Sequence, residues 1–215
     1  MAAARRSFFA ILIASIIAGF VWAPGARATT LHLSQFSSET DPTAAVLDAT
    51  LVLLLTGPSE LTLTLTNDTA APDAYLINGV WFNAAAHVTG LGLVSATHSD
   101  AGDVTAAWDP VEADSKADGF GSFDFGLTDG VGAGNPNLIG PGETVDFVLT
   151  IAGTGSYDIS DFDVLNDHGI RAAAKFVSGP GGQSAFGATG ETPEPGTAAL
   201  LGAGLLGMAL AGCRR

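Results

Sequence analysis

Cysteine and basic residues are scarce in this chain of 215 residues. It has one cysteine, and its 8 lysines and arginines stand against 22 aspartates and glutamates, a formal net charge of -14. A single cysteine excludes an intramolecular disulfide and a cysteine-based zinc site. The acidic balance argues against sequence-independent binding to nucleic acid, which needs basic side chains to displace counterions from phosphate.

Charge and apolar residues are unevenly divided along the chain. Five of the eight basic residues lie within residues 1–28 or 214–215, and the longest apolar runs also lie near the two ends. Residues 29–190 keep three basic residues against 20 acidic ones, a net charge of -17. The sequence therefore predicts an acidic body between two basic, apolar ends.

The N-terminal segment has the three parts of a secretory signal peptide. Arg5 and Arg6 precede an apolar run over residues 8–22, and Ala26-Arg27-Ala28 follows it. A basic region, a short apolar region and an A-x-A site form a signal that is removed after export, and the run is shorter than the roughly 20 residues of a transmembrane helix. Residues 1–28 are therefore expected to pass through the Sec translocon. Signal peptidase is expected to recognise Ala26 and Ala28 and to cut after Ala28.

The C-terminal segment has a different three-part order. Pro193-Glu194-Pro195 is followed by an uncharged, mostly apolar run over residues 197–213 and then by Arg214 and Arg215. A helix of that length reaches about 25 Å, which is enough to cross a slightly thinned bilayer. Terminal arginines favour the cytoplasmic side. The run therefore predicts a single transmembrane helix with the body on the outer side of the membrane.

This tail resembles the PEP-CTERM sorting signal of Gram-negative bacteria. The resemblance covers residues 193–215, with Pro193, Glu194 and Pro195 as the motif. It implies recognition by an exosortase, a membrane-embedded cysteine protease or transpeptidase that removes the tail near the motif. It also implies a protein anchored briefly in the inner membrane, with its body in the periplasm, and then moved to the cell surface or extracellular matrix. Proteins with this signal are associated with exopolysaccharide and biofilm.

Short alternating segments dominate the body. Residues 60–66 and 144–151 alternate apolar and polar positions with period two, which is typical of half-buried strands. Glycine-rich and proline-rich turns separate the segments, and no convincing helix pattern occurs. We therefore expect an all-β antiparallel two-sheet sandwich, immunoglobulin-like or jelly-roll, over residues 29–177, and a flexible linker over residues 178–192. Further strands are expected at 31–36, 46–56, 74–82, 87–94, 104–108, 120–125 and 170–177.

No catalytic motif is evident in the body. The four histidines are far apart in sequence, which favours isolated surface or strand-edge positions. Two acidic groups could supply oxygen ligands for Ca²⁺ or a pair of catalytic carboxylates, but neither has the calcium-loop spacing and no pair stands out. They are Asp109, Glu112, Asp114 and Asp118, and Asp158, Asp161, Asp163 and Asp167. Tyr75, Trp81, Trp108 and Tyr157 are expected to be buried more readily than to form a sugar-stacking platform.

The sequence thus favours a non-enzymatic, exported protein with no cofactor. Its expected role is structural or adhesive and is linked to exopolysaccharide. The alternative is a secreted carbohydrate-active enzyme or a calcium-dependent glycan-binding module. The strands predict a fold, and a fold does not define a ligand.

Overall fold

The structure is a computed structural model that describes residues 27–36, 47–70, 75–130, 137–179 and 182–190. Among these residues there are eleven strands, two short 3-10 helices and no α-helix, so the predicted all-β class is confirmed. The short helices are η1 (Thr105–Ala107) and η2 (Ile159–Phe162). The strands are β1 (Ala28–Phe36), β2 (Ala49–Gly57), β3 (Glu60–Asn67), β4 (Leu76–Phe82), β5 (Val88–His98), β6 (Gly102–Asp103), β7 (Glu112–Ala117), β8 (Gly121–Thr128), β9 (Thr144–Gly153), β10 (Ala172–Val177) and β11 (Ala185–Thr189).

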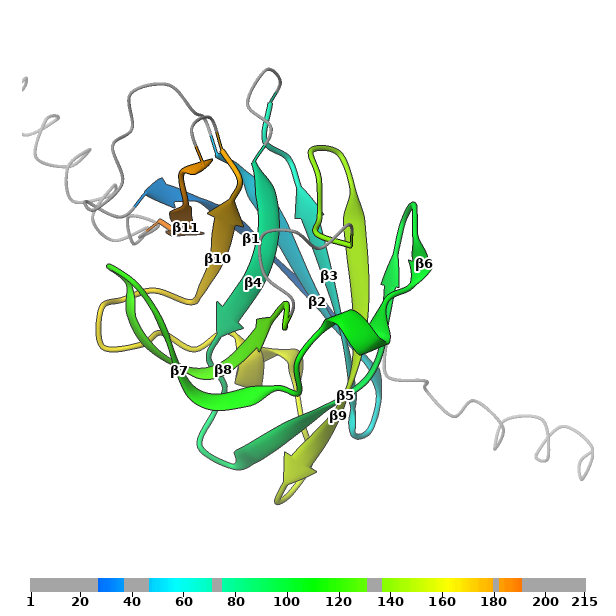
Figure 1. The fold of residues 1–215 in the computed structure, drawn as a ribbon. Coiled ribbons are helices and arrows are strands. Elements are labelled where there is room, and N and C mark those ends of the chain that lie inside the picture. Colours follow the sequence, from blue (N-terminus) through cyan, green and yellow to red (C-terminus); the bar gives the residue numbers. More distant parts are fainter. Residues whose placement is uncertain (1–26, 37–46, 71–74, 131–136, 180–181, 191–215) are drawn as a thin grey trace, which may run out of the picture.

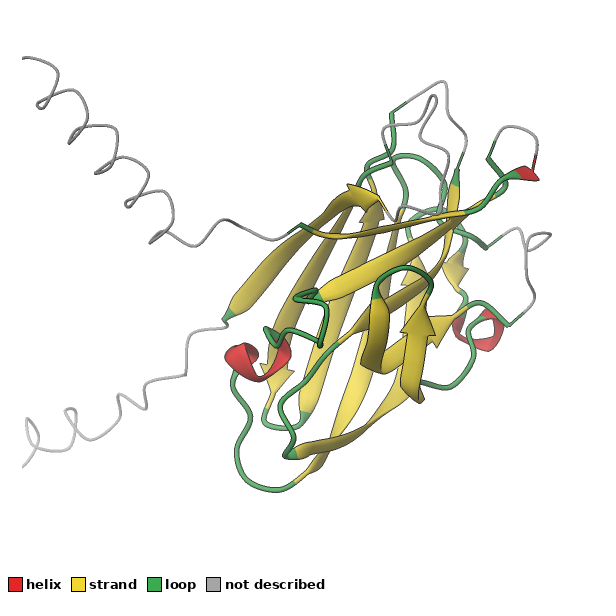
Figure 2. Ribbon diagram, turned by 90° about the vertical axis from the view of Figure 1, so that its left-hand side faces the viewer, coloured by secondary structure: helices red, strands yellow, loops and turns green. Residues whose placement is uncertain are grey.

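All the strands form one antiparallel sheet in the order β6-β5-β9-β3-β2-β1-β11-β10-β4-β8-β7. The strand β1 joins the two halves, because its residues 28–32 pair with β2 and its residues 33–36 pair with β11. Figure 1 shows this shared strand in blue, and Figure 2 shows how the sheet curls. The prediction of two separate sheets packed as a sandwich is therefore not confirmed. The first strand continues from one half into the other.

Alternation in sequence places one side of each central strand in the core. Leu61, Leu63 and Leu65 of β3 are fully buried, whereas the threonines between them are partly exposed. Leu63 lies opposite Leu53 of β2 and Phe147 of β9. Since side chains in a strand point alternately to opposite faces, this register makes one apolar layer across three strands.

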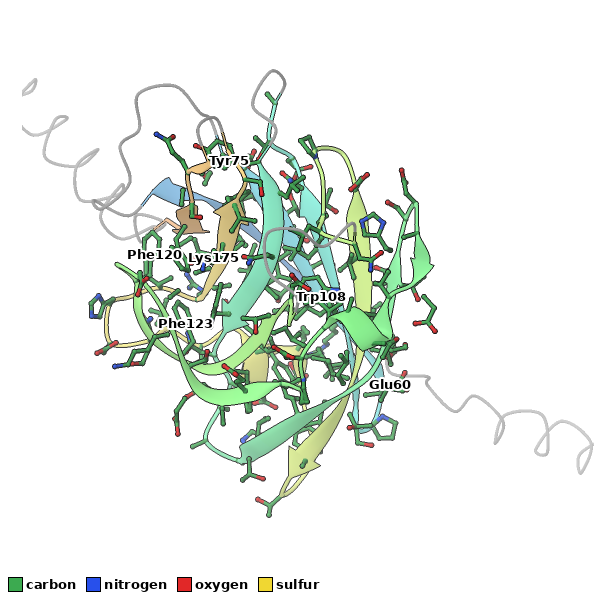
Figure 3. All side chains as sticks on the ribbon, viewed as in Figure 1. Glu60, Tyr75, Trp108, Phe120, Phe123 and Lys175 are labelled. Atoms are coloured by element: carbon green, nitrogen blue, oxygen red, sulfur yellow. The ribbon has the colours of Figure 1, made fainter. Side chains whose placement is uncertain are left out.

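Residues from both halves of the sheet share the main core. Leu63 and Phe147 from one half belong to the same buried cluster as Phe82 and Phe176 from the other. Trp108 joins this cluster and places its ring edge-on to that of Phe147, with 4.7 Å between centroids (Figure 3). Nine apolar residues of the strands are all buried: Leu61, Leu63, Leu65, Trp81, Phe123, Val145, Phe147, Leu149 and Ile151.

Trp81 and Phe123 belong to a second cluster on the other face of β4 and β10. The indole of Trp81 crosses Gly126 of β8 so closely that a Cβ there would lie 2.8 Å from its Cδ1 and Nε1 atoms. Its Nε1 donates a hydrogen bond of 2.9 Å to Ser115 Oγ on β7. Glycine at position 126 is therefore needed for this packing.

Two sequence predictions are wrong in detail. Residues 104–108, predicted as a strand, contain η1, since Asp103 accepts hydrogen bonds from the backbone and the hydroxyl of Thr105 and turns the chain. The flexible linker predicted over 178–192 contains β11, which lies between β1 and β10. The strands β6 and β7 were not expected, because β6 is very short and β7 is rich in charged residues.

Both processing segments lie almost wholly outside the described residues. Only Arg27 and Ala28 of the predicted signal peptide are described, and the predicted transmembrane run over 197–213 is not. Within the described ranges, no helix is long and apolar enough to cross a membrane.

Candidate functional site

The chain leaves the sheet directly before the predicted sorting motif. Thr189, at the end of β11, is buried opposite Leu33 of β1, and its Oγ1 accepts a 2.9 Å hydrogen bond from the backbone N–H of Arg171. Gly190 is exposed, and Pro193 follows it by three residues. Three extended residues span at most about 11 Å. The motif residues Pro193, Glu194 and Pro195 lie outside the described residues. The strand that precedes them, β11, is held in the sheet.

The predicted signal peptidase site adjoins the other end of the described chain. Ala28 lies opposite Leu54 in the ladder between β1 and β2, one residue before the predicted start of the body. Arg27 Nη1 lies 3.0 Å from Asp158 Oδ2 in an exposed ion pair. Ala26 lies outside the described residues. The predicted cut after Ala28 would therefore remove Arg27 and the first residue of β1.

The first acidic group is spread along β7 and its flanking turns. Glu112, Asp114 and Asp118 are exposed, and Asp109 is half-buried. The strand β7 is the last in the sheet, so one of its edges has no neighbour among the described strands. Charged side chains on such an edge oppose pairing with another chain. This group therefore has a structural explanation.

The second acidic group serves the turn around η2. Asp158 Oδ1 accepts a 3.1 Å hydrogen bond from the backbone N–H of Ser160, and Asp161 Oδ2 accepts a 2.7 Å bond from that of Asp158. The backbone and hydroxyl of Ser160 hold the pKa of Asp158 below its ordinary value. Asp163 forms an ion pair with Arg171. Across the part of the chain that the structure describes, no three His, Cys, Asp or Glu side chains are gathered to hold a metal.

His98 departs from the expectation of isolated surface or strand-edge histidines. Its side chain is 2% exposed, and its Nε2 lies 3.4 Å from Glu143 Oε2. Its Nδ1 accepts hydrogen bonds from the backbone N–H groups of Asp100 and Ala101, at 3.1 and 3.3 Å. These contacts fix the turn between β5 and β6. No motif marks this role, because the partners are two backbone N–H groups and Glu143, which is 45 positions away and just before β9.

The aromatic residues mostly serve the core. Tyr75, Trp81 and Trp108 are buried, as predicted. Tyr157 is partly buried and stacks on the ring of His87, with 5.8 Å between centroids. The four rings do not gather into one platform, since Trp81 lies in the second cluster and Trp108 in the main core.

The segment that follows β11 is the one that the comparisons recognise. Residues 191–215 match the family model of the PEP-CTERM protein-sorting motif. This chain carries a PEP-CTERM sorting motif. The resemblance seen in Pro193, Glu194 and Pro195 is thereby confirmed, and the PEP-CTERM motif marks an exported protein that is anchored in a membrane and targeted by an exosortase. No curated protein and no solved structure matches the chain, and the body matches no other family.

Proposed function

We propose that this protein is a structural or adhesive component of the cell envelope or extracellular matrix of a Gram-negative bacterium. Signal peptidase removes residues 1–28 after export through the Sec translocon. The apolar run over 197–213 then holds the protein in the inner membrane with its body in the periplasm. An exosortase cuts near Pro193-Glu194-Pro195 and passes the body to the cell surface, where it works with exopolysaccharide.

The observation that carries this proposal is the PEP-CTERM motif joined to the end of a folded β domain. Two prolines prevent a helix and keep the segment extended, since proline lacks an N–H and restricts the residue before it. A protease binds its substrate as an extended strand. Glu194, between the two prolines in the sequence, adds one charge to the motif.

The local contacts of the acidic side chains in the body support the proposed non-enzymatic role. The carboxylates of Asp158, Asp161 and Asp163 have local partners that explain them. The acidic surface supports solubility outside the cell, because a net charge far from zero keeps copies of a protein apart.

The sorting step can be tested with Glu194→Ala in the full chain, expressed in its own host. We expect export to continue while the uncut protein accumulates in the inner membrane. Glu191→Ala is the matched control, since it removes the same charge three residues before Glu194. Equal release of the two variants would contradict recognition of Glu194. Loss of both proteins from the envelope would contradict the claim that the motif acts after export.

A further inference from the structure

His98, the last residue of β5, is a buried titratable side chain that the sorting proposal does not use. Its side chain is 2% exposed, and the chain turns directly after it to enter β6. The strand β6 is the outermost strand at this edge of the sheet (Figure 1). The contacts of this ring therefore bear on how the sheet ends.

The hydrogen bonds of the His98 ring define where its proton lies. Its Nδ1 accepts the backbone N–H of Asp100 at 3.1 Å and that of Ala101 at 3.3 Å. A ring nitrogen that accepts carries no proton, and a neutral imidazole has one N–H, so the proton is assigned to Nε2. Nε2 lies 3.4 Å from Glu143 Oε2. The intact turn therefore requires an Nδ1 atom without a proton.

A second proton on this ring is incompatible with the turn. It binds at Nδ1, because Nε2 already carries one, and Nδ1 then has no lone pair for the N–H groups of Asp100 and Ala101. Both residues are exposed, so their N–H groups reach water once the turn moves away from the ring. The carboxylate of Glu143 attracts the charged ring. Protonation therefore leaves the ring beside Glu143 and opens the turn.

The other charged groups near this end of β5 do not face the ring. Asp103 of β6 and Asp146 of β9 both lie opposite Thr97, and adjacent residues of a strand point to opposite faces. The short helix η1, which packs against β5, has no titratable residue. The ladder partners of His98 are also uncharged: Gly102 and Val145. Among the described residues, Glu143 is therefore the charged partner of the ring.

Contacts on both sides of the turn limit how far it opens. The backbone N–H of Ser99 donates to the carbonyl of Thr144 at 2.8 Å, and that of Val104 donates to the carbonyl of Ala96 at 2.9 Å. Neither bond involves the ring. Between them, β6 has two residues and pairs only with the last two residues of β5. The part that opens is therefore residues 100–103, which include β6.

We propose that His98 is a pH-sensitive switch at this edge of the sheet. Its neutral ring holds residues 100–103 in place, and its protonated ring releases them and uncovers the end of β5. Histidine is the side chain whose charge ordinarily changes between pH 5 and 8. Since the open turn is the form that accepts the extra proton, the turn is held at the higher pH and released as the pH falls. This inference goes beyond the sorting proposal and does not depend on it.

The test is hydrogen exchange of the detergent-solubilised full chain, followed for single amides by NMR at pH 8 and pH 5. The measured quantity is the protection factor, the ratio of intrinsic to observed exchange rate, which removes the direct effect of pH on exchange. The protection factors of Asp100 and Ala101 should fall at least tenfold at pH 5. That of Leu63, in the central strand β3, should stay the same. The ring of His98 should titrate over the same pH range as the fall.

His98→Asn separates the hydrogen bonds of the ring from its titration. The asparagine Oδ1 can accept the same two N–H groups and does not bind a proton in this pH range, so protection should be equal at pH 8 and pH 5. His168→Asn is the matched control, since it removes an exposed histidine and should behave like the native chain. Glu143→Gln should move the fall in protection to lower pH, because the charged ring loses the carboxylate beside it.

Three results would overturn the inference. The first is equal protection of Asp100 and Ala101 at pH 8 and pH 5 in the native chain. The second is the same loss of protection in His98→Asn as in the native chain. The third is an equal loss at Leu63, which would mean that the whole body opens in acid. If His98→Asn fails to fold, the native chain decides, because a His98 ring that titrates while the turn keeps its protection contradicts the switch.

Discussion

Leu33 of β1 lies opposite Thr189 of β11, so the first and last described strands are neighbours in the sheet. Thr189 also receives the backbone N–H of Arg171, which ties the end of β11 to the start of β10. Ala185 and Ala188 of β11 are buried. The folded body therefore includes β11, which ends just before the PEP-CTERM motif.

This pairing predicts at which residues the chain can be truncated without losing its fold. A chain that ends at Val177 should lose cooperative unfolding, because β1 and β10 are left with unpaired edges and the buried positions of β11 are emptied. A chain that ends at Thr192 keeps β11 and should melt like the body of the full protein. Circular dichroism during heating checks both. A cooperative transition in the shorter chain would contradict the role assigned to β11.

Gly126→Ala should destabilise the body by about 1–3 kcal/mol, the usual cost of overpacking. The added Cβ meets the Trp81 indole and Ser115 Oγ at 2.8 Å, so the ring must shift and its bond to Ser115 is weakened. Gly90→Ala is the control, since its Cβ meets only Ala152 at an ordinary 3.7 Å. Urea unfolding measures both. Equal stability of the two variants would show that Trp81 does not require glycine at 126.

Asn67→Ala should cost about 1–3 kcal/mol, because the buried carbonyls of Tyr75 and Ile139 each lose a donor, although that of Ile139 keeps the backbone N–H of Ile77. Asn67 is fully buried, and its Nδ2 donates to the carbonyls of Tyr75 and Ile139 at 2.8 and 2.9 Å. Thr62→Ala, at a partly exposed position of the same strand, should cost less than about 1 kcal/mol. Urea denaturation gives both values. A larger loss of stability in Thr62→Ala than in Asn67→Ala would mean that the Asn67 amide does not hold the segments around Tyr75 and Ile139 together.

Asp158 should make stability depend on acid pH. Hydrogen bonds from Ser160 lower the folded-state pKa of this carboxyl from its ordinary value of 3.8. A lowered folded pKa gives stability that is present above the unfolded pKa and lost as the pH falls through the folded one. Asp158→Asn should therefore lower the melting temperature at neutral pH, and this effect should be lost in acid as the pH falls below 3.8 and through the folded-state pKa. A difference in melting temperature between Asp158→Asn and the wild type that stays the same in strong acid would contradict this role of Asp158.

The sequence predicts the central strands well and the edges poorly. The leucines and threonines of β3 alternate strictly, because one face is buried and the other meets water. The strand β7 (EADSKA) has no such pattern, since it is an edge strand held by its hairpin with β8. The strand β11 contains two alanines and a glycine that fit between neighbours at close range, a composition that resembles a linker.

The sorting motif could be found from sequence because its proline, glutamate, apolar and arginine positions are consecutive in the chain. The pairing of β3 with β9 could not, because it joins residues more than 75 positions apart. The role of Asn67 also depends on the distant backbone carbonyl of Ile139, and that of His98 on the distant carboxylate of Glu143. Local pattern carries no information about such contacts.

The most direct test of this account is the intact mass of the protein recovered from the cell surface. We predict a single species that begins at Thr29 and ends near Pro193-Glu194-Pro195, without Arg215 and with β11 intact. A surface species that begins at Thr29 and still ends at Arg215 would contradict processing by an exosortase.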